Sequence, residues 1–573
     1  MIDLMVNNRR VKGEPGEMLL STLKRAGVHV PTLCHLEGLF PSGACRMCVV
    51  EVEGVSGLVP SCAYPVREGL TVFTHSTRAV QARKTIIELL LANHPDDCLY
   101  CNRNTHCDLQ KLAADYNVRS RQYFGQRTSH NIDMSSPSIV RDPDKCILCG
   151  KCVRVCEEVQ GVACIDFVGR GSKTTVGTAF EQGLNVSSCV NCGQCIMVCP
   201  TGALREHSHI KDVLAALDDP EKKVVVQHAP AISVTVGEEL GLKPGTDAFG
   251  VLTAALRGMG FDRVFDTGFS ADLTVIEEAS ELVHRIRNGG RLPMITSCSP
   301  GWVKFTEEFY PEFMGNISTC KSPQQMMGAI VKSYFAQQEG TEPANIYSVS
   351  IMPCVAKKFE ASRPEMGSHG TPDVDAVLTT RELVQLLAMR GVDASKLRPE
   401  RADTPFGDRS TAGKLFGATG GVMEAALRTA HFILTGEEWP KSRIQSLRGM
   451  APRKEAQVKI GGTELGVVVV SGLMEARTLL EEIRQGRDDI HFIEVMTCPG
   501  GCIAGGGQPQ HSDPEILKAR MQALYAIDRD GDVRTAHSNR SVQRLYDEFL
   551  GEPLSPESHR LLHTHYVKRN VVL

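Results

Sequence analysis

The chain has 573 residues, of which 42% are hydrophobic, so it exceeds what one core usually contains, and three or more domains are expected. Its net charge of −4 and scattered basic residues favour neither nucleic acid nor an anionic membrane surface as a partner. No apolar run reaches the roughly 18 residues of a membrane span. Arg9 and Arg10 precede a polar segment rather than an apolar one, so neither a twin-arginine signal nor another signal peptide is expected.

Cysteine is the most informative residue type. The chain contains 21 cysteines, 16 of them before Pro200, and many are separated by two residues. Such spacing suits metal ligation better than a disulfide framework, and dense thiolates need a reducing compartment. We therefore expect a cytoplasmic protein with a cofactor-rich N-terminal third.

The first predicted domain, residues 1–75, contains short apolar runs at 4–6 and 49–52 that indicate strands between Gly/Pro turns. Its cysteines resemble a plant-type 2Fe-2S loop, although the first gap is ten residues where that loop has four. A zinc site is the alternative, but zinc sites usually have two Cys-x2-Cys pairs. The expected ligands are Cys34, Cys45, Cys48 and Cys62.

The second predicted domain, residues 76–125, begins with a helical stretch over 76–92 that leads to His94. The pattern His-x3-Cys-x2-Cys-x5-Cys places four ligands within fourteen residues. Zinc and a 4Fe-4S cluster are both compatible with three thiolates and one imidazole. The neighbouring clusters favour iron, so we expect a 4Fe-4S site at His94, Cys98, Cys101 and Cys107.

The third predicted domain, residues 126–207, contains an internal repeat that matches the bacterial two-cluster ferredoxin pattern. In that pattern the fourth cysteine of each run binds the other cluster. One 4Fe-4S cluster is therefore assigned to Cys146, Cys149, Cys152 and Cys199, and the other to Cys156, Cys189, Cys192 and Cys195. Cys164 falls outside both runs, and we interpret it as a buried apolar residue.

The fourth predicted domain, residues 208–573, alternates strand-like runs such as 224–226 and 346–352 with helical runs such as 250–259. This alternation predicts α/β layers with parallel sheet. The expected fold class is therefore multidomain, α+β and α/β, with ferredoxin-like iron-sulfur modules before an α/β active-site domain. Four of its five cysteines, at 298, 354, 498 and 502, lie beside Gly or Pro in predicted loops.

Three segments carry a family resemblance. They read TSCSPGW (296–302), MPCVAKKFE (352–360) and EVMTCPGGCIAGGGQP (494–509). They resemble the three active-site signatures of the FeFe-hydrogenases, and the order of the preceding clusters resembles the multi-cluster members of that family. The resemblance covers essentially the whole chain and implies a hydrogenase that interconverts protons, electrons and H2.

The resemblance also implies a cofactor, the H-cluster, which is a 4Fe-4S cluster joined to a di-iron subsite with CO, cyanide and azadithiolate. Cys354, Cys498 and Cys502 would bind the 4Fe-4S part, and Cys502 would bridge to the subsite. Lys357 would donate to a cyanide. Five further residues would surround the subsite, namely Pro230, Gln324, Met352, Phe416 and Met496. Each of them could equally be an ordinary core residue.

Glu278, Glu281 and Arg285 share one face of a predicted helix, a pattern that on its own is typical of a solvated face. The resemblance implies instead that the two glutamates, with Ser318, relay protons to Cys298.

Ser299 departs from the family, whose first signature has a second cysteine there as a cluster ligand. A thiol near pKa 8.5 ionises far more readily than a water-like hydroxyl, by about 7 pKa units or on the order of 10 kcal/mol. A thiolate should therefore supply the missing bond. Cys298 could turn to the cluster, but we expect Cys320 to replace the ligand, although free buried cysteine is commonly inert.

The sequence thus predicts an oxygen-sensitive hydrogenase subunit with one 2Fe-2S cluster, three accessory 4Fe-4S clusters and the H-cluster. Expected partners are maturation proteins and either ferredoxin or flavin-containing, NAD(P)H-binding iron-sulfur subunits. The chain lacks a G-x-G-x-x-G fingerprint after a strand, so we do not expect it to bind NAD(P)H itself. The alternatives are an H2-sensing or electron-transfer protein that retains this scaffold, which Ser299 favours, and an iron-sulfur assembly relative.

Overall fold

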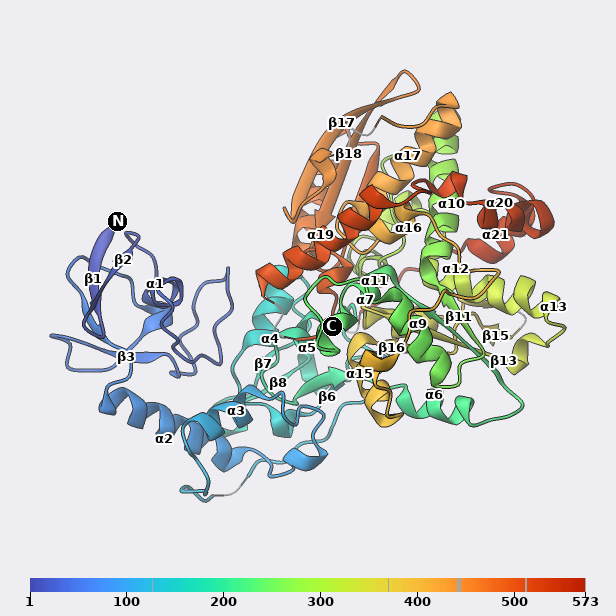
Figure 1. Ribbon diagram of the computed structural model, residues 1–573. Coiled ribbons are helices and arrows are strands. Elements are labelled where there is room, and N and C mark those ends of the chain that lie inside the picture. The colour runs from blue at the N-terminus through green and yellow to red at the C-terminus, as the bar shows by residue number, and fades with distance from the viewer. Residues whose placement is uncertain (126, 369, 441–444, 511–512, 572–573) are drawn as a thin grey trace.

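The computed structural model describes residues 1–125, 127–368, 370–440, 445–510 and 513–571. Figure 1 shows the N-terminal modules as an arm that leads into a larger body of helices and sheets. None of the helices in this described part has the length and apolar character needed to span a lipid bilayer.

The first module is a mixed sheet in the order β2-β1-β5-β3-β4. Its strands are β1 (Ile2–Val6), β2 (Arg9–Gly13), β3 (Val49–Val52), β4 (Val59–Pro60) and β5 (Thr71–Phe73), and helix α1 is Leu19–Arg25. The runs predicted as strands at 4–6 and 49–52 are β1 and β3. Alternate residues of β1, Leu4 and Val6, point into a core that also contains Cys48 and Cys62.

The second module is helical. Helix α2 (Thr77–Asn93) begins at Ser76, whose hydroxyl accepts from the Ala79 N–H, and it ends at His94. Helix α3 (Asp108–Asp115) starts directly after Cys107. A small core shared by α2 and α3 includes Leu33 of the first module and is contacted by Ile147 of the third, so the three modules are packed in series.

The third module has two short helices, α4 (Lys151–Arg154) and α5 (Gln194–Val198), each following a glycine with positive φ, and two antiparallel pairs of strands. The pairs are β6 (Ile139–Arg141) with β9 (Leu204–Glu206), and β7 (Asp166–Val168) with β8 (Thr175–Gly177). The two cysteine runs are thus arranged as the sequence repeat predicts.

Two sheets form the centre of the large domain. The first is fully parallel in the order β11-β10-β13-β16, with β10 (Lys223–His228), β11 (Arg263–Asp266), β13 (Ile346–Met352) and β16 (Ala376–Thr379). The second has the order β12-β19-β18-β17, with β12 (Met294–Ile295), β17 (Arg453–Ile460), β18 (Thr463–Ser471) and β19 (Phe492–Met496). In the second sheet only the β17/β18 pair is antiparallel. The apolar runs of buried parallel strands explain why the predicted α/β layering is confirmed.

Helices cover these sheets. They include α9 (Phe249–Gly258), α10 (Thr267–Arg287), α11 (Pro300–Phe309), α12 (Pro323–Ile330), α16 (Thr411–Leu415) and α17 (Gly421–Thr435). Helix α10 is long and almost wholly buried over its first four turns, and it packs against α12, α16 and α17. Its buried position makes the charged residues along it unusual.

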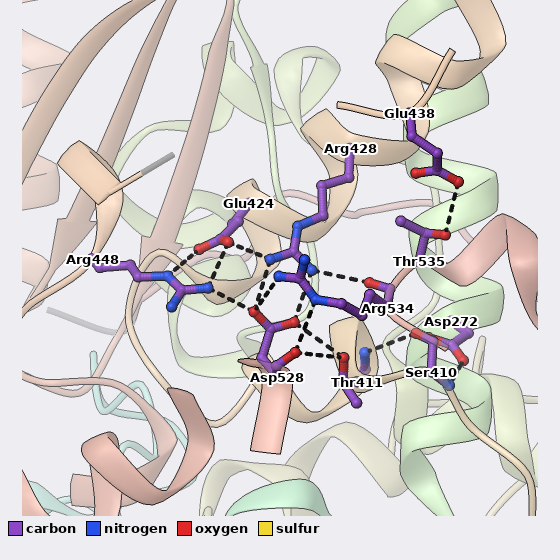
Figure 2. Close-up of polar contacts among 11 residues, drawn as sticks. Asp272, Ser410, Thr411, Glu424, Arg428, Glu438, Arg448, Asp528, Arg534 and Thr535 are labelled. Atoms are coloured by element: carbon purple, nitrogen blue, oxygen red, sulfur yellow. Dashed lines mark hydrogen bonds and ion pairs between the residues drawn. The ribbon is translucent and has the colours of Figure 1, made fainter. Parts of the chain in front are cut away.

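The C-terminal helices α19 (Pro514–Asp530), α20 (Arg540–Leu545) and α21 (Pro556–Leu562) wrap around this body (Figure 1). Asp528 of α19 joins Arg428 and Arg448 at N–O distances of 2.9 and 2.7 Å. Both arginines also pair with Glu424 of α17, and Arg534 pairs with Asp528 as well (Figure 2). This charge network is mostly buried, so it fixes α19 against α17.

Candidate active site

Loops that follow four parallel strands meet at one place. Cys354 comes two residues after β13, and Cys498 two residues after β19. Cys298 follows β12, and Pro230 follows β10. Parallel strands of one sheet present their carboxyl ends at the same edge. Strands β10 and β13 belong to one sheet and β12 and β19 to the other, so loops from both sheets contribute to one crevice.

These loops enclose a cavity of about 90 Å³ with a mainly apolar wall. It brings together every residue predicted to hold or surround the active centre except Cys320. The lining includes Pro230, Cys298, Ser299, Gln324, Met352, Cys354, Lys357, Phe416, Met496, Cys498 and Cys502.

The three cysteines predicted as cluster ligands are close enough to disfavour one another's ionisation. Burial, together with the nearby Cys354 thiol, raises the pKa of Cys502 to about 12. Burial also raises the pKa of the Cys498 thiol, and the nearby Cys354 and Cys502 thiols contribute to this shift. A cationic metal centre would remove this penalty, so the donor set fits an iron-sulfur cluster better than it fits three free thiols.

Lys357 contributes a fixed positive charge to the cavity wall. Its Nζ donates to both oxygens of Glu360, at 2.9 and 3.1 Å, and to the Cys298 carbonyl at 3.2 Å. Glu360 also accepts from Gln324 Nε2 at 3.1 Å. A buried ammonium in such a dry site is suited to an anionic ligand.

The predicted proton-relay residues form a connected group. Ser318 donates to Glu281 Oε2 at 2.7 Å, and Arg285 donates to Glu281 Oε1 at 2.6 and 3.0 Å. Glu278 Oε1 accepts from the Ser297 N–H at 3.4 Å, next to Cys298, whereas Glu278 Oε2 is buried without a hydrogen-bond partner.

Burial, reinforced by Glu281, raises the pKa of Glu278 to about 8, so its carboxyl is protonated at neutral pH. Burial also raises the pKa of Cys298, and Glu278 raises it further. A neutral acid beside a neutral thiol can pass a proton on, and no buried charge remains once the acid is reprotonated from the outer glutamate.

Of the residues that could be the fourth ligand, Cys298 lines the cavity, whereas Ser299 and Cys320 lie in different surroundings. Ser299 lines the cavity, and its hydroxyl is 2.8 Å from that of Thr497. Cys320, by contrast, is not among the described residues of the cavity wall. Its backbone pairs with His563, and its Sγ is 3.9 Å from Glu281 Oε2, so this arrangement does not support the prediction that Cys320 supplies the ligand.

The ferredoxin-like module has two smaller cavities, one for each predicted ligand set. Cys146, Cys149, Cys152 and Cys199 line the first, and Cys156, Cys189, Cys192 and Cys195 line the second. The crossover grouping expected from the sequence is thus the one the fold brings together. Cys192 lines both the second cavity and the active-site cavity, so the two sites share a wall.

The remaining predicted sites lie further along the arm. His94 Nδ1 is buried without a hydrogen-bond partner, as a ligand nitrogen would be before metal binding. A Cβ on Gly202 would lie 2.6 Å from the Cys101 Sγ, so this site closely approaches the ferredoxin-like module. In the first module Cys48 Sγ is 3.3 Å from Cys62 Sγ, and the Cys45 N–H is 3.5 Å from Cys34 Sγ.

Two residues gain importance only from the structure. Cys164 Sγ lies 3.6 Å from Cys156 Sγ and lines the second ferredoxin-like cavity, so it is next to a predicted cluster rather than remote from both. His563 lies beside Glu281 and Cys320. Cysteine spacing does not identify Cys164, because the run that ends at Cys156 already has its four cysteines. It does not identify His563 either, because Glu281 and Cys320 are distant from it in the sequence.

Five family matches cover most of the chain. Residues 222–506 match "Iron only hydrogenase large subunit, C-terminal domain" and 514–569 match "Iron hydrogenase small subunit". Residues 1–77 match a "2Fe-2S iron-sulfur cluster binding domain". Residues 83–122 match the "NADH-ubiquinone oxidoreductase-G iron-sulfur binding region", and 136–205 match the "NADH-quinone oxidoreductase subunit 3, ferredoxin-like domain".

Whole-chain relatives agree with these matches. The chain is 47% identical to the NADP-reducing hydrogenase subunit HndD of Solidesulfovibrio fructosivorans, over 99% of both chains. It is 38% identical to iron hydrogenase 1 of Clostridium pasteurianum, over 99% of this chain and 100% of that protein. A solved FeFe-hydrogenase structure from Chlamydomonas reinhardtii matches with a TM-score of 0.58 and 41% identity, covering 64% of this chain and 100% of that one.

Proposed function

Because the chain belongs to the iron-only, or FeFe, hydrogenase family, we propose that it catalyses the reversible reaction of two protons and two electrons to H2. The observation that carries this proposal is the cavity that joins Cys354, Cys498 and Cys502 with Lys357 and the end of a buried acid relay. The comparisons confirm the family that the resemblance in the sequence indicated.

The residues around the cavity fit the H-cluster. Cys354, Cys498 and Cys502 would hold its 4Fe-4S part, with Cys502 as the bridge, and Lys357 would hold a cyanide. When bound, this group supplies the redox chemistry at iron. Met352, Phe416 and Met496 give an apolar wall that excludes water.

The chain itself supplies the protons. Arg285 and Ser318 fix the Glu281 carboxylate, which receives protons from the surface side of α10. Glu278 then carries a proton on its carboxyl at neutral pH, and Cys298 delivers it into the cavity. Each group lies near the next, so only short rearrangements are needed.

Electrons travel along the arm. We propose one 2Fe-2S cluster and three accessory 4Fe-4S clusters in the ligand sets described, because their sites follow one another in packing order and the last shares Cys192 with the active-site cavity. Partners that bind flavin and NAD(P)H are favoured over ferredoxin alone, since the 47%-identical relative is named as an NADP-reducing hydrogenase subunit. Maturation proteins would install the di-iron part, and a reducing, cytoplasmic setting suits the thiolates.

For the fourth position of the active-site cluster we propose Ser299. It is on the cavity wall, whereas Cys320 faces Glu281, and using Cys298 would remove the proton donor. Ser299→Ala should then lower iron retention at this cluster, and Ser299→Cys should raise it above wild type. Equal iron contents in all three proteins would contradict Ser299 as the ligand.

Infrared spectroscopy of matured protein tests the whole proposal, since CO and cyanide bands report directly on the di-iron subsite. Their presence together with H2 evolution supports an enzyme. Ser299, which weakens the ligand set, favours an H2 sensor as the second candidate, and that role would give the bands with very slow turnover.

A further inference from the structure

A second group of metal-binding side chains lies outside the active-site cavity. Glu281 Oε2, Cys320 Sγ and a ring nitrogen of His563 all lie within 4.8 Å of one another, and all three residues are buried. Thiolate, imidazole and carboxylate are the three ligand types that zinc selects. Glu281 Oε2 and Cys320 Sγ are 3.9 Å apart, close to the roughly 3.5 Å between two ligands of a tetrahedral zinc ion.

The backbone holds these ligands in position. Cys320 and His563 are directly opposite in an antiparallel bridge. Two backbone hydrogen bonds flank the bridge, from the Lys321 N–H to the Leu562 carbonyl and from the Thr564 N–H to the Thr319 carbonyl, both at 2.7 Å. The segment after α21 thus carries His563 to the edge of α10, where Glu281 lies.

His563 is also oriented as zinc-bound histidines are. Its Nε2 lies 3.1 Å from Glu277 Oε2, and its Nδ1 faces the Thr319 hydroxyl at 2.8 Å. Metal-binding histidines almost always donate the N–H of their other ring nitrogen to a carboxylate, a backbone carbonyl or water, which fixes the tautomer. Glu277 fills that role here, and Tyr546 and Ser558 donate hydrogen bonds that hold it.

The local charge favours a dication. Glu277 lies beside His563, and its carboxyl accepts hydrogen bonds from Ser558 and Tyr546. Glu281 is the second carboxylate, and Arg285 is its only cationic partner within the described ion pairs. A metal ion could enter from solvent because Thr319 is only half-buried and the Glu281 side chain keeps about 10% of its surface exposed.

We propose that Glu281, Cys320 and His563 form an inhibitory zinc site, with water or the Thr319 hydroxyl as the fourth ligand. Binding releases the Cys320 thiol proton to solvent and breaks the Thr319–His563 hydrogen bond. Because Glu281 is the outer acid of the relay, zinc on its Oε2 stops proton transfer. This consequence rests on the proposed hydrogenase function, but zinc binding itself does not.

The test uses the full-length protein with its clusters, kept anaerobic in chelator-free buffer and titrated with ZnCl2. Zinc and iron per chain are measured by mass spectrometry after gel filtration, and the zinc X-ray absorption edge reports its ligands. H2 evolution is measured with an artificial reductant, and each variant is compared with its own zinc-free rate.

Wild type should bind one zinc per chain with one sulfur and two or three N/O ligands, lose no iron, and slow at least tenfold. Cys320→Ala, Cys320→Ser and His563→Gln should each lose this zinc and its inhibition. His559→Gln is the matched control, because His559 is exposed and its ring centroid is only 4.2 Å from that of His563. It should behave as wild type.

Zinc bound equally by Cys320→Ala, zinc that appears only as iron is lost, or no bound zinc would each overturn the site. If wild type evolves no H2 at all, the proposed function fails. The number of zinc ions per chain and the zinc absorption edge still show whether the zinc site exists. If zinc binds as expected but the rate is unchanged, the site stands as a structural one and its inhibitory role is overturned.

Discussion

Glu278 gives the sharpest test of the proton route. Glu278→Gln keeps the size and polarity of the side chain but removes its titratable proton. A positioned general acid contributes about 10²–10⁴ in rate, so H2 evolution should fall by that factor while the clusters remain. Iron content and the CO and cyanide infrared bands should be those of wild type.

The structure also sets the pH dependence. Burial raises the pKa of Glu278 from its ordinary 4.5 to about 8. Between these two pH values the folded protein therefore keeps a proton that an exposed glutamate would lose. At a pKa of about 8, roughly 90% of Glu278 is protonated at pH 7 and roughly 10% at pH 9. Wild-type H2 evolution should therefore decline about ninefold over that interval, and Glu278→Gln should show only a low, flat profile.

Glu308 supplies the matched control. Burial raises the pKa of its carboxyl to about 7, but it pairs with Lys304 on α11 and does not line the cavity. Glu308→Gln should keep the wild-type rate and pH profile. The assay is H2 evolution with an artificial reductant, which bypasses the physiological partner. A Glu278→Gln rate within threefold of wild type would refute the relay, as would a wild-type rate that does not decline between pH 7 and 9.

Other outcomes follow from the same contacts. Cys298→Ser should retain all iron yet lose about 10²–10⁴ in H2 evolution, because a hydroxyl is too weak an acid to pass the proton on; normal turnover would contradict its role. Cys502→Ala should lose the CO and cyanide bands while the electron paramagnetic resonance signal of the reduced 2Fe-2S cluster persists, and unchanged bands would exclude it as the bridge. Protein that has been reconstituted before the di-iron subsite is installed should contain about eighteen irons per chain. Zinc in place of the 4Fe-4S cluster at His94, Cys98, Cys101 and Cys107 would contradict this count. Asp528→Asn breaks a buried ion pair and should destabilise the protein by about 3–5 kcal/mol in thermal unfolding, whereas Asp530→Asn, at an exposed pair, should not. The pKa of Asp528 is lowered by Arg428 although burial opposes this, so its contribution is present at neutral pH and lost as pH falls.

Features that depend on residues close together in the chain could be predicted from the sequence. Cysteines two residues apart share one loop, so the spacing of the repeat was enough to predict which of them gather, and the fold groups them in that way. Strand β10 was predictable because buried parallel strands contain continuous apolar runs, here Val224 to Val226. The family resemblance added the roles that we propose for Lys357 and Cys502, which no spacing rule contains.

Tertiary structure decided what depends on residues far apart in the chain. Cys354 and Cys498 become neighbours only because β13 and β19 end at the same cavity. Chemical reasoning favoured Cys320 over Ser299 as a ligand, since a thiol ionises more readily. In the structure the bridge to His563 turns Cys320 toward Glu281 while Ser299 lies on the cavity wall, which is why we propose Ser299 as the ligand. A sequence records which side chains are available, but the pairing of distant backbone segments determines which of them meet.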